Sequence, residues 1–321
     1  MKLVSELGEL GLIARIRAGR TGRNRAVKVG IGDDCAVVRV PGGCEMVVST
    51  DLSVEGRHFR RDWHTPQSVG HRCLARGLSD MAAMGAKPIA AFLSLALPRA
   101  TEMAWVDGFL EGFEALADDS WVQLAGGDTA EAPGKEIVAD VTVIGAARTE
   151  RAILRSGAGA GDAIYCTGRL GGAAVELAGL AEGAVCPVAV SRRHPQTFPE
   201  PRISIGKALT RRRLAKACID LSDGLSTDLR HLCEASGVGA AIEAEAIPLA
   251  NGATLEQALH GGEDYELLFA TREWSRVPKQ FSGVRVTRIG KITEERGVRI
   301  VQPDGTVEEL RASGWEHFKD S

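Results

Sequence analysis

Acidic residues stand beside glycine, or at the ends of apolar runs, at several places along the chain. They occur in Gly32-Asp33-Asp34, Ser49-Thr50-Asp51, Ser79-Asp80, Gly126-Gly127-Asp128, Asp220-Leu221-Ser222-Asp223-Gly224 and Gly261-Gly262-Glu263-Asp264. Carboxylates gathered in one crevice would repel one another and resist desolvation unless cations lay between them. Hard oxygen ligands favour Mg²⁺ over softer metals. The pattern therefore predicts a magnesium site if these segments come together at strand ends.

Each acidic motif also has an ordinary structural interpretation. Gly126-Gly127-Asp128 alone is more typical of a turn, and Asp80, in a helical stretch, of a solvated or capping acid. Asp33 next to Asp34 is harder to explain in this way, because adjacent acids are combined with a glycine-rich backbone that can approach phosphate. Asp220 and Asp223 flank Ser222 where a strand gives way to a helix. Backbone amides, a hydroxyl and two carboxylates could all face an anion there.

The common nucleotide-binding signatures are missing. Gly206-Lys207 is followed by Ala208, and Pro201 stands where a P-loop has its first glycine. Gly157-Ala158-Gly159 lacks the third glycine of the dinucleotide fingerprint, because Asp162 occupies that place. The His-Arg-Asp and Asp-Phe-Gly motifs of protein kinases are also absent. If ATP binds, carboxylates, metal ions and glycine turns must hold it.

The elements that position these acids alternate between short β-branched runs and longer stretches with helical spacing, which predicts an α/β (α+β layered) fold. Helices are expected over 65–85, 102–118, 172–181, 202–214 and 225–236, and strands over 27–29, 46–50, 89–97, 121–125, 137–146, 163–167, 217–220 and 265–271. Gly85 and Gly237 indicate helix ends. The glycine-rich stretch 155–162 is the strongest boundary signal, so we expect domains over 1–150 and 151–321.

Composition favours a folded globular protein, since 44% of the 321 residues are hydrophobic and 25% are charged. Lys and Arg total 39 against 42 Asp and Glu, without a long basic run, so no nucleic-acid partner is expected. Acids interrupt the N-terminal segment, and no apolar stretch approaches the roughly 18 residues of a membrane span. The seven cysteines lack metal or redox spacing, which favours mostly buried thiols in the cytoplasm.

Taken in order, these segments resemble the thiamine-monophosphate kinases, a family in the superfamily of aminoimidazole-ribonucleotide synthetase and selenophosphate synthetase. The resemblance covers nearly the whole chain. It is carried by Gly30–Ala36, Ser49–Asp51, Gly56–Phe59, Leu78–Ala86, Gly126–Thr129, Arg155–Ala158, Ile219–Leu225 and Gly261–Leu267. It implies two α/β domains of the aminoimidazole-ribonucleotide synthetase type. The first, with a mixed sheet, would bind ATP and Mg²⁺ and pair with its twin in a homodimer, and the second would complete the active site.

The resemblance also implies an activity: Mg²⁺-assisted, in-line transfer of a phosphoryl group from ATP to thiamine monophosphate. The product would be thiamine diphosphate, in the last step of its biosynthesis. The resemblance assigns several Mg²⁺ ions to Asp34, Ser49, Thr50, Asp51, Asp80, Asp128, Asp220 and Asp223, with Asp34, Asp51, Asp128 and Asp220 as the catalytic acids. It assigns ATP to the Gly127-Asp128 turn, Arg155 and Ser222, and the thiamine phosphate to His58, Glu263 and Trp315. A family aromatic that contacts ATP would fall near residues 109–113.

The implied mechanism needs no general base. A phosphate monoester has a second pKa near 6, so its oxygen is already an anionic nucleophile at neutral pH. Metal ions would screen the two phosphates, and Arg155 would add positive charge at the donor. Trp315 could cover the cationic thiazolium or simply pack the C-terminus.

Other functions remain open at this point. Selenophosphate synthetase is disfavoured, because the first cysteine, Cys35, lies inside the acidic motif instead of in a glycine-rich N-terminal segment. Aminoimidazole-ribonucleotide synthetase is the nearest alternative enzyme, and a non-catalytic sensor of metal and nucleotide is the alternative from another class.

Overall fold

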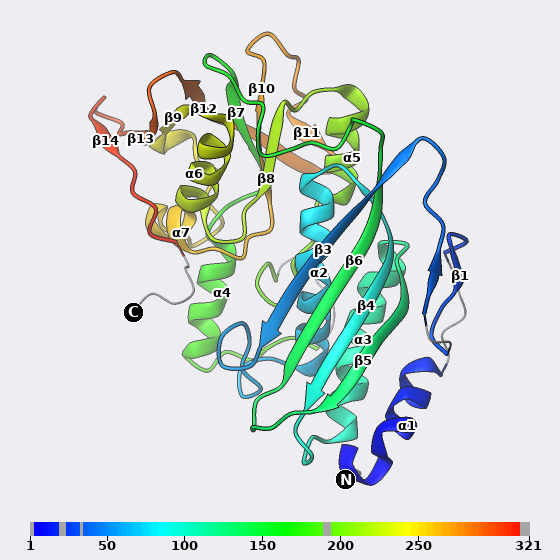
Figure 1. Ribbon diagram of the computed structural model, residues 1–321. Helices are drawn as coiled ribbons and strands as arrows, with labels where there is room; N and C mark the ends of the chain where they lie inside the picture. Colours follow the sequence, from blue (N-terminus) through cyan, green and yellow to red (C-terminus); the bar gives the residue numbers. More distant parts are fainter. Residues whose placement is uncertain (1–2, 19–23, 33–34, 189–193, 315–321) are drawn as a thin grey trace. The chain divides into compact units, whose positions relative to one another are not determined.

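The computed structural model describes residues 3–18, 24–32, 35–188 and 194–314 (Figure 1). The chain divides into two compact units. The first comprises Met1–Met81, Lys87–Glu150 and Leu180–Arg192, and the second comprises Ala82–Ala86, Arg151–Gly179 and Arg193–Ser321. Each unit has its own sheet and its own core.

A mixed four-stranded sheet forms the centre of the first unit. Its order is β3 (Cys44–Val54), β6 (Val138–Arg148), β4 (Lys87–Leu97) and β5 (Gln123–Glu131). Only β4 and β5 run parallel, which confirms the mixed sheet expected for the N-terminal domain. A short helix, α1 (Val4–Arg17), and a two-stranded pair, β1 (Val27–Val29) with β2 (Val37–Val38), precede the sheet.

Helices α2 (Pro66–Ala83) and α3 (Met103–Asp119) cover one face of this sheet (Figure 1). The two helices touch through their backbones: a Cβ on Gly70 would lie 1.8 Å from the carbonyl oxygen of Phe109. Phe109 and Phe113 are fully buried and stack with their ring centroids 6.4 Å apart. The aromatic side chains expected near residues 109–113 therefore belong to the core of this unit.

Strand β3 divides its side chains between two environments. The odd-numbered residues Ser49 and Asp51 face α2, because they contact Asp80 and Arg76 of that helix. The even-numbered residues point to the opposite face of the sheet, where Met46, Val48 and Leu52 are 58%, 52% and 53% exposed. This row, the open face of β3, leaves an apolar surface in contact with solvent.

A larger sheet forms the second unit, in the order β14-β13-β9-β12-β7-β10-β8, with β11 beside β12. The strands are β7 (Ala163–Thr167), β8 (Ala217–Asp220), β9 (Gly239–Glu243), β10 (Leu267–Thr271), β11 (Gln280–Phe281), β12 (Val284–Thr293), β13 (Gly297–Val301) and β14 (Val307–Glu309). The helices are α4 (Gly172–Ala181), α5 (Ile203–Arg212), α6 (Leu225–Ser236) and α7 (Leu255–His260), with a 3₁₀ turn, η1 (Ala244–Ala246). All pairs except β9 with β13 are antiparallel.

The core of the second unit lies on both faces of this sheet. Leu268 of β10 packs with Leu229 and Leu232 of α6. The next residue, Phe269, packs on the other face with Ile205 and Leu209 of α5. A strand buried on both faces in this way explains the uninterrupted apolar run that begins at Leu267.

Most expected elements are present. The strands over 163–167 and 217–220 and the helices over 172–181 and 225–236 match residue for residue. One expectation was wrong: Gly126-Gly127-Asp128 is not a turn, because β5 continues through it. Gly127 pairs with Leu93, and a Cβ on Gly127 would lie 1.9 Å from the carbonyl oxygen of Leu93. Glycine is therefore what allows the strand to continue there.

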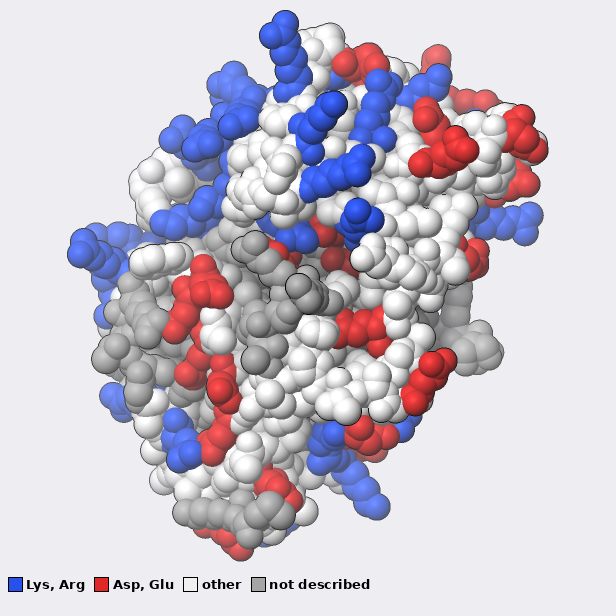
Figure 2. Space-filling model, turned by 180° about the vertical axis from the view of Figure 1, so that it is seen from behind, with Lys and Arg blue, Asp and Glu red and all other residues white. Residues whose placement is uncertain are grey.

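The surface carries both signs of charge. On the face seen in Figure 2, Lys and Arg side chains gather over the second unit, and Asp and Glu side chains lie among them. The seven cysteines are free thiols, five of them buried, as expected. In the part of the chain that the structure describes, no helix is long and apolar enough to cross a membrane.

Candidate active site

Two carboxylates meet between β3 and α2 in the first unit. Ser49 of β3 donates a hydrogen bond to Asp80 of α2. Asp51, two residues further along β3, has its Oδ1 atom 3.7 Å from Nε of Arg76. The pKa of Asp51 is raised to about 6, mainly by burial and then by the negative charge of Asp80, although Arg76 opposes the shift.

Asp51 has an oxygen without a protein partner. Its Oδ2 atom is buried and accepts no hydrogen bond, and α2 approaches so closely that a Cβ on Gly77 would lie 3.6 Å from it. A buried carboxylate oxygen without a donor is costly to desolvate, and a hard cation is the ligand that such an oxygen binds best. The residues around Asp51 therefore fit Mg²⁺.

A second polar row crosses the other face of the same sheet. Thr50 Oγ1 donates to Asp140 Oδ1 at 3.0 Å. Asp140 pairs in register with Ser94, and Ser94 pairs with Asp128, so β6, β4 and β5 each contribute one polar side chain. Asp140 was missed in the sequence analysis. The sequence feature that could have identified Asp140 is an acid at an alternating position in an otherwise apolar strand.

A cavity of about 680 Å³ lies next to this row. It is lined by the glycine-rich backbone Gly30 to Gly32, by Phe92, and by β5 from Leu124 to Thr129. Glycine backbone gives an anion access to N–H groups, and an aromatic side chain gives a base a flat surface. Gly127 and Asp128, which were expected to contact ATP, are therefore part of a pocket large enough for a nucleotide.

In the second unit, the acids expected as metal ligands lie where β8 passes into α6. Asp220 is the last residue of β8, and Ser222 and Asp223 form the turn that follows. Asp228, on α6, accepts the backbone N–H groups of Asp223 at 3.0 Å and Gly224 at 3.1 Å. Asp228 therefore fixes this turn from inside the helix.

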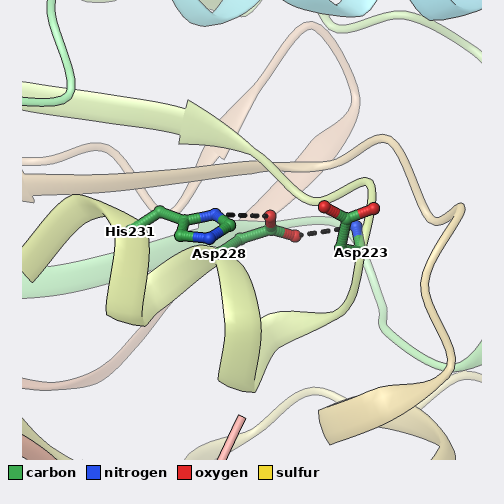
Figure 3. A group of neighbouring side chains, drawn as sticks. All are labelled: Asp223, Asp228 and His231. Carbon is green, nitrogen blue, oxygen red and sulfur yellow. Dashed lines mark hydrogen bonds and ion pairs between the residues drawn. The ribbon is translucent and has the colours of Figure 1, made fainter. Parts of the chain in front are cut away.

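Asp228 lies between the turn and His231 (Figure 3). One ligand atom from each of Asp223, Asp228 and His231 lies within 4.8 Å of the others, and His231 Nδ1 is 4.0 Å from Asp228 Oδ1. Burial raises the pKa of Asp228, and the charges of Asp220 and Asp223 add to the shift. The other oxygen of Asp228 already accepts backbone hydrogen bonds, so we interpret this group as a structural support for Asp223.

Glu263 follows a glycine in a strained segment. Gly262, Glu263 and Tyr265 have φ angles of 69°, 56° and 48°, a region that costs non-glycine residues about 1–2 kcal/mol each. Backbone hydrogen bonds hold the segment: Glu263 N–H donates to the Ser222 carbonyl at 2.7 Å, and Tyr265 N–H to the Leu221 carbonyl at 2.9 Å. The residue expected to contact the acceptor is thus bound to the turn expected to hold metal and ATP.

The two acids after Glu263 are bound to protein donors. Asp264 accepts the backbone N–H groups of Gly171 at 2.7 Å and Ala173 at 3.2 Å, at the start of α4. Burial raises the pKa of Asp264 to about 7, although these hydrogen bonds oppose the shift. Glu266 forms a bidentate ion pair with Arg202: Nε of Arg202 donates to Oε2 at 2.8 Å, and Nη2 donates to Oε1 at 2.5 Å.

Comparisons with known proteins identify the family to which the chain belongs. Residues 32–147 match the model of the AIR synthase related protein, N-terminal domain, and residues 159–302 match that of the C-terminal domain. Thiamine-monophosphate kinase from Salmonella typhimurium is 38% identical over 97% of this chain and 98% of its own length. The chain belongs to the thiamine-monophosphate kinase family. The enzyme of that name from Bacillus subtilis is 33% identical, over 94% of this chain and 96% of its own length.

Solved structures extend the similarity to the fold. Thiamine-monophosphate kinase from Stenotrophomonas maltophilia superposes with a TM-score of 0.80 at 34% identity, covering 92% of this chain and 96% of that one. AaThiL, complexed with AMPPCP and TMP, superposes with a TM-score of 0.75 at 31% identity and covers 99% of both chains. Hydrogenase maturation protein HypE in complex with ATP, at 17% identity, has a TM-score of 0.76, covers 95% of both chains and shares the fold alone. The aminoimidazole-ribonucleotide synthetase-like fold is thereby confirmed.

The structure places the family's expected site residues in separate groups. Ser49, Asp51 and Asp80 meet on the helix-covered face of the first sheet, whereas Thr50 points to the opposite face. Asp51 lies in the middle of β3, not at a strand end as expected, because β3 continues to Val54. Asp34 and Trp315 lie outside the described residues.

His58 and Arg155 complete the expected set. Val54 N–H donates to His58 Nδ1 at 2.9 Å, which leaves the proton of a neutral ring on Nε2. The carbonyl of His58 accepts a hydrogen bond from Arg72 at 2.9 Å. Arg155 has an exposed side chain, and its carbonyl accepts from Ser236 at 3.0 Å.

Proposed function

We propose that this protein transfers the γ-phosphoryl group of ATP to thiamine monophosphate with the help of Mg²⁺. One observation carries the proposal: Asp51 has a buried, unpartnered oxygen beside Asp80, in a chain of the thiamine-monophosphate kinase family. Two acids in this position are poorly stabilised by the protein alone. The proposal therefore explains why they lie together.

The metal ligands proposed are those named from the family motifs. In the first unit they are Asp34, Ser49, Thr50, Asp51, Asp80 and Asp128, and in the second Asp220 and Asp223. Bound Mg²⁺ would neutralise the phosphate charges and favour in-line approach of the acceptor oxygen. Asp34, Asp51, Asp128 and Asp220 are the proposed catalytic acids.

The remaining groups would hold the two substrates. Gly127, Arg155 and Ser222 are proposed for ATP, and His58, Glu263 and Trp315 for thiamine monophosphate. His58 Nδ1 accepts a backbone N–H, which sets the orientation of the ring and leaves the proton of a neutral ring on Nε2. The acceptor phosphate is ionised at neutral pH, so none of these residues has to remove a proton.

Product analysis tests the proposal. The purified protein with ATP, Mg²⁺ and thiamine monophosphate should yield ADP and thiamine diphosphate in equal amounts. Turnover with aminoimidazole precursors but not with thiamine monophosphate would instead identify the related synthetase. Binding of Mg²⁺ and ATP without ADP release that depends on thiamine monophosphate would indicate a sensor.

We also propose that the protein works as a homodimer in the cytoplasm. The open face of β3, with Met46, Val48 and Leu52 more than half exposed, supports pairing with a second copy, because such apolar rows mark interfaces. The free thiols support a reducing compartment. Light scattering should give a dimer for the wild type and a monomer for Val48→Glu; a monomeric wild type would contradict the proposal.

A further inference from the structure

The carboxylate of Glu263 has a side-chain partner in a distant part of the sequence. Gln196 Nε2 donates to Glu263 Oε2 at 3.3 Å. Gln196 is only 1% exposed, so its amide cannot readily turn towards water. The terminal torsion of a glutamate is broad and roughly two-fold, and a donor fixed on one oxygen restricts that rotation.

Gln196 is itself held in place by a second acid. Its backbone N–H donates to Glu176 Oε2 at 2.8 Å. Thr197 Oγ1 and His194 Nδ1 contact the other oxygen, Oε1, at 2.7 Å and 3.1 Å. Glu176 lies on α4, the helix whose first N–H groups are bound by Asp264. The segment that carries Gln196 is therefore tied to the helix next to the Glu263 segment.

The far end of the same segment is tied to the Glu263 motif directly. Arg202 binds both oxygens of Glu266, which also accepts a hydrogen bond from Thr167. The Arg202 and Glu266 side chains are only 15% and 5% exposed. Residues 194–202 thus have one anchor at each end, and Gln196 reaches Glu263 from between them.

We propose that Gln196 is a positioning residue for the acceptor: its amide fixes the plane of the Glu263 carboxylate that contacts a cationic, phosphorylated substrate. The inference rests on the proposed role of Glu263 in holding that substrate. Gln196 would have no part in binding ATP or metal. Its loss should therefore weaken acceptor binding selectively.

Two substitutions at this position test the inference, each measured with purified full-length protein. Gln196→Glu keeps the shape but turns a donor into a like charge, and Gln196→Met keeps the length but removes the donor. Both leave the backbone hydrogen bond to Glu176 available. We expect the KM for thiamine monophosphate to rise by about tenfold for Gln196→Glu and by about threefold for Gln196→Met, while the KM for ATP changes by less than about twofold.

Gln302→Glu is the matched control. Gln302 Nε2 donates to Glu308 Oε2 at 3.0 Å, the same kind of amide–carboxylate pair, but on the surface of the second unit. This substitution should leave both KM values unchanged. If Gln196→Glu fails to fold, Gln196→Met still decides the outcome.

A double-mutant cycle with Glu263→Gln completes the test. If Gln196 acts through Glu263, Gln196→Met should add less than about twofold to the KM increase of Glu263→Gln, because the oriented carboxylate is already gone. An unchanged KM in the Gln196 single variants, an equal rise for both substrates, or full additivity would overturn the inference. A wild type without activity on thiamine monophosphate would instead overturn the proposed function.

Discussion

Asp51 and Asp264 are both partly buried acids whose carboxyl pKa values burial raises, to about 6 and about 7, yet their surroundings are opposite. Asp264 accepts two backbone N–H groups at the start of α4. Asp51 has an oxygen that accepts nothing and faces the charge of Asp80. In the second unit, Asp264 is part of the hydrogen-bonded framework. In the first unit, Asp51 has an oxygen for which the protein supplies no hydrogen-bond donor.

The difference shows that a raised pKa alone does not identify a ligand. Perturbed carboxyls occur at functional sites and in structural networks alike. What separates the two cases is whether the protein supplies hydrogen-bond donors to the buried oxygens. By that criterion Asp51 fits the role of a cation ligand, whereas Asp228 and Asp264 are held by backbone N–H donors.

The largest expected effect is on turnover. Replacing Asp51 or Asp128 by Asn keeps the size but removes the charge that Mg²⁺ needs, and kcat should fall by about 100-fold or more. Steady-state rates at saturating Mg²⁺ measure this. Asp62→Asn is the control, because Asp62 is an exposed acid paired with Arg60 in the same unit, and it should keep normal turnover. Near-normal turnover of both Asp51→Asn and Asp128→Asn would show that these acids have a structural role and do not bind the metal.

The next effect is on stability in the second unit. Asp264→Ala leaves two backbone N–H groups without their acceptor, and the free energy of unfolding should fall by about 2–3 kcal/mol, with or without Mg²⁺. Urea unfolding measures it. Asp304→Ala is the control, because exposed Asp304 also accepts a backbone N–H, from Thr306 at 2.8 Å. If the free energy of unfolding falls no more than in the control, Asp264 does not have this structural role.

A smaller effect of opposite sign is expected for Asp51. Its pKa is higher in the folded protein, so the folded state binds more protons between about pH 4 and 6, and stability falls as pH rises through that window. Without Mg²⁺, Asp51→Asn should therefore be more stable than the wild type above pH 6, by about 1–2 kcal/mol, which is less than the full shift implies because solvent screens a side chain that is 22% exposed. The two should converge near pH 4. Thermal unfolding in a chelator at both ends of the window checks this, and a destabilised variant at pH 7.5 would contradict the comparison.

The smallest effect concerns the two hydroxyls next to Asp51. Ser49 binds Asp80 on the helix-covered face, whereas Thr50 binds Asp140 on the other face. Ser49→Ala should lower kcat by about tenfold and Thr50→Val by no more than about threefold, since only Ser49 shares a face with Asp51. The ratio of the two kcat values at a fixed Mg²⁺ concentration measures the difference. Equal losses would show that both faces of β3 serve one metal site.

The sequence predicted those parts of the fold that local signals determine. The turn from β8 to α6 could be located because its glycine, acids and apolar flanks lie within a few residues. The continuation of β5 through Gly127 could not, because it depends on the close approach of Leu93 from a strand about thirty residues earlier. Periodicity does not report such an approach.

The site was predictable to the same extent. The family motifs named Asp51, Asp80 and Glu263, and the structure brings the first two together. The supporting residues Asp228, Gln196 and Arg202 were not foreseen, because each acts on a partner through a contact that no short motif encodes. Asp140 was overlooked because it lies alone within a mostly apolar strand and next to no glycine or other acid.

The two faces of strand β3 carry side chains in different surroundings, so substitutions on each face have different effects. A change at Val48 or Leu52 alters the surface offered to another molecule, and a change at Ser49 or Asp51 alters the surroundings of a charge. Substitutions at either set leave the other face of the strand in place. A single inserted residue would exchange the two sets at one step. Across related chains, the length of this strand should therefore stay constant, because any insertion or deletion would exchange its two faces.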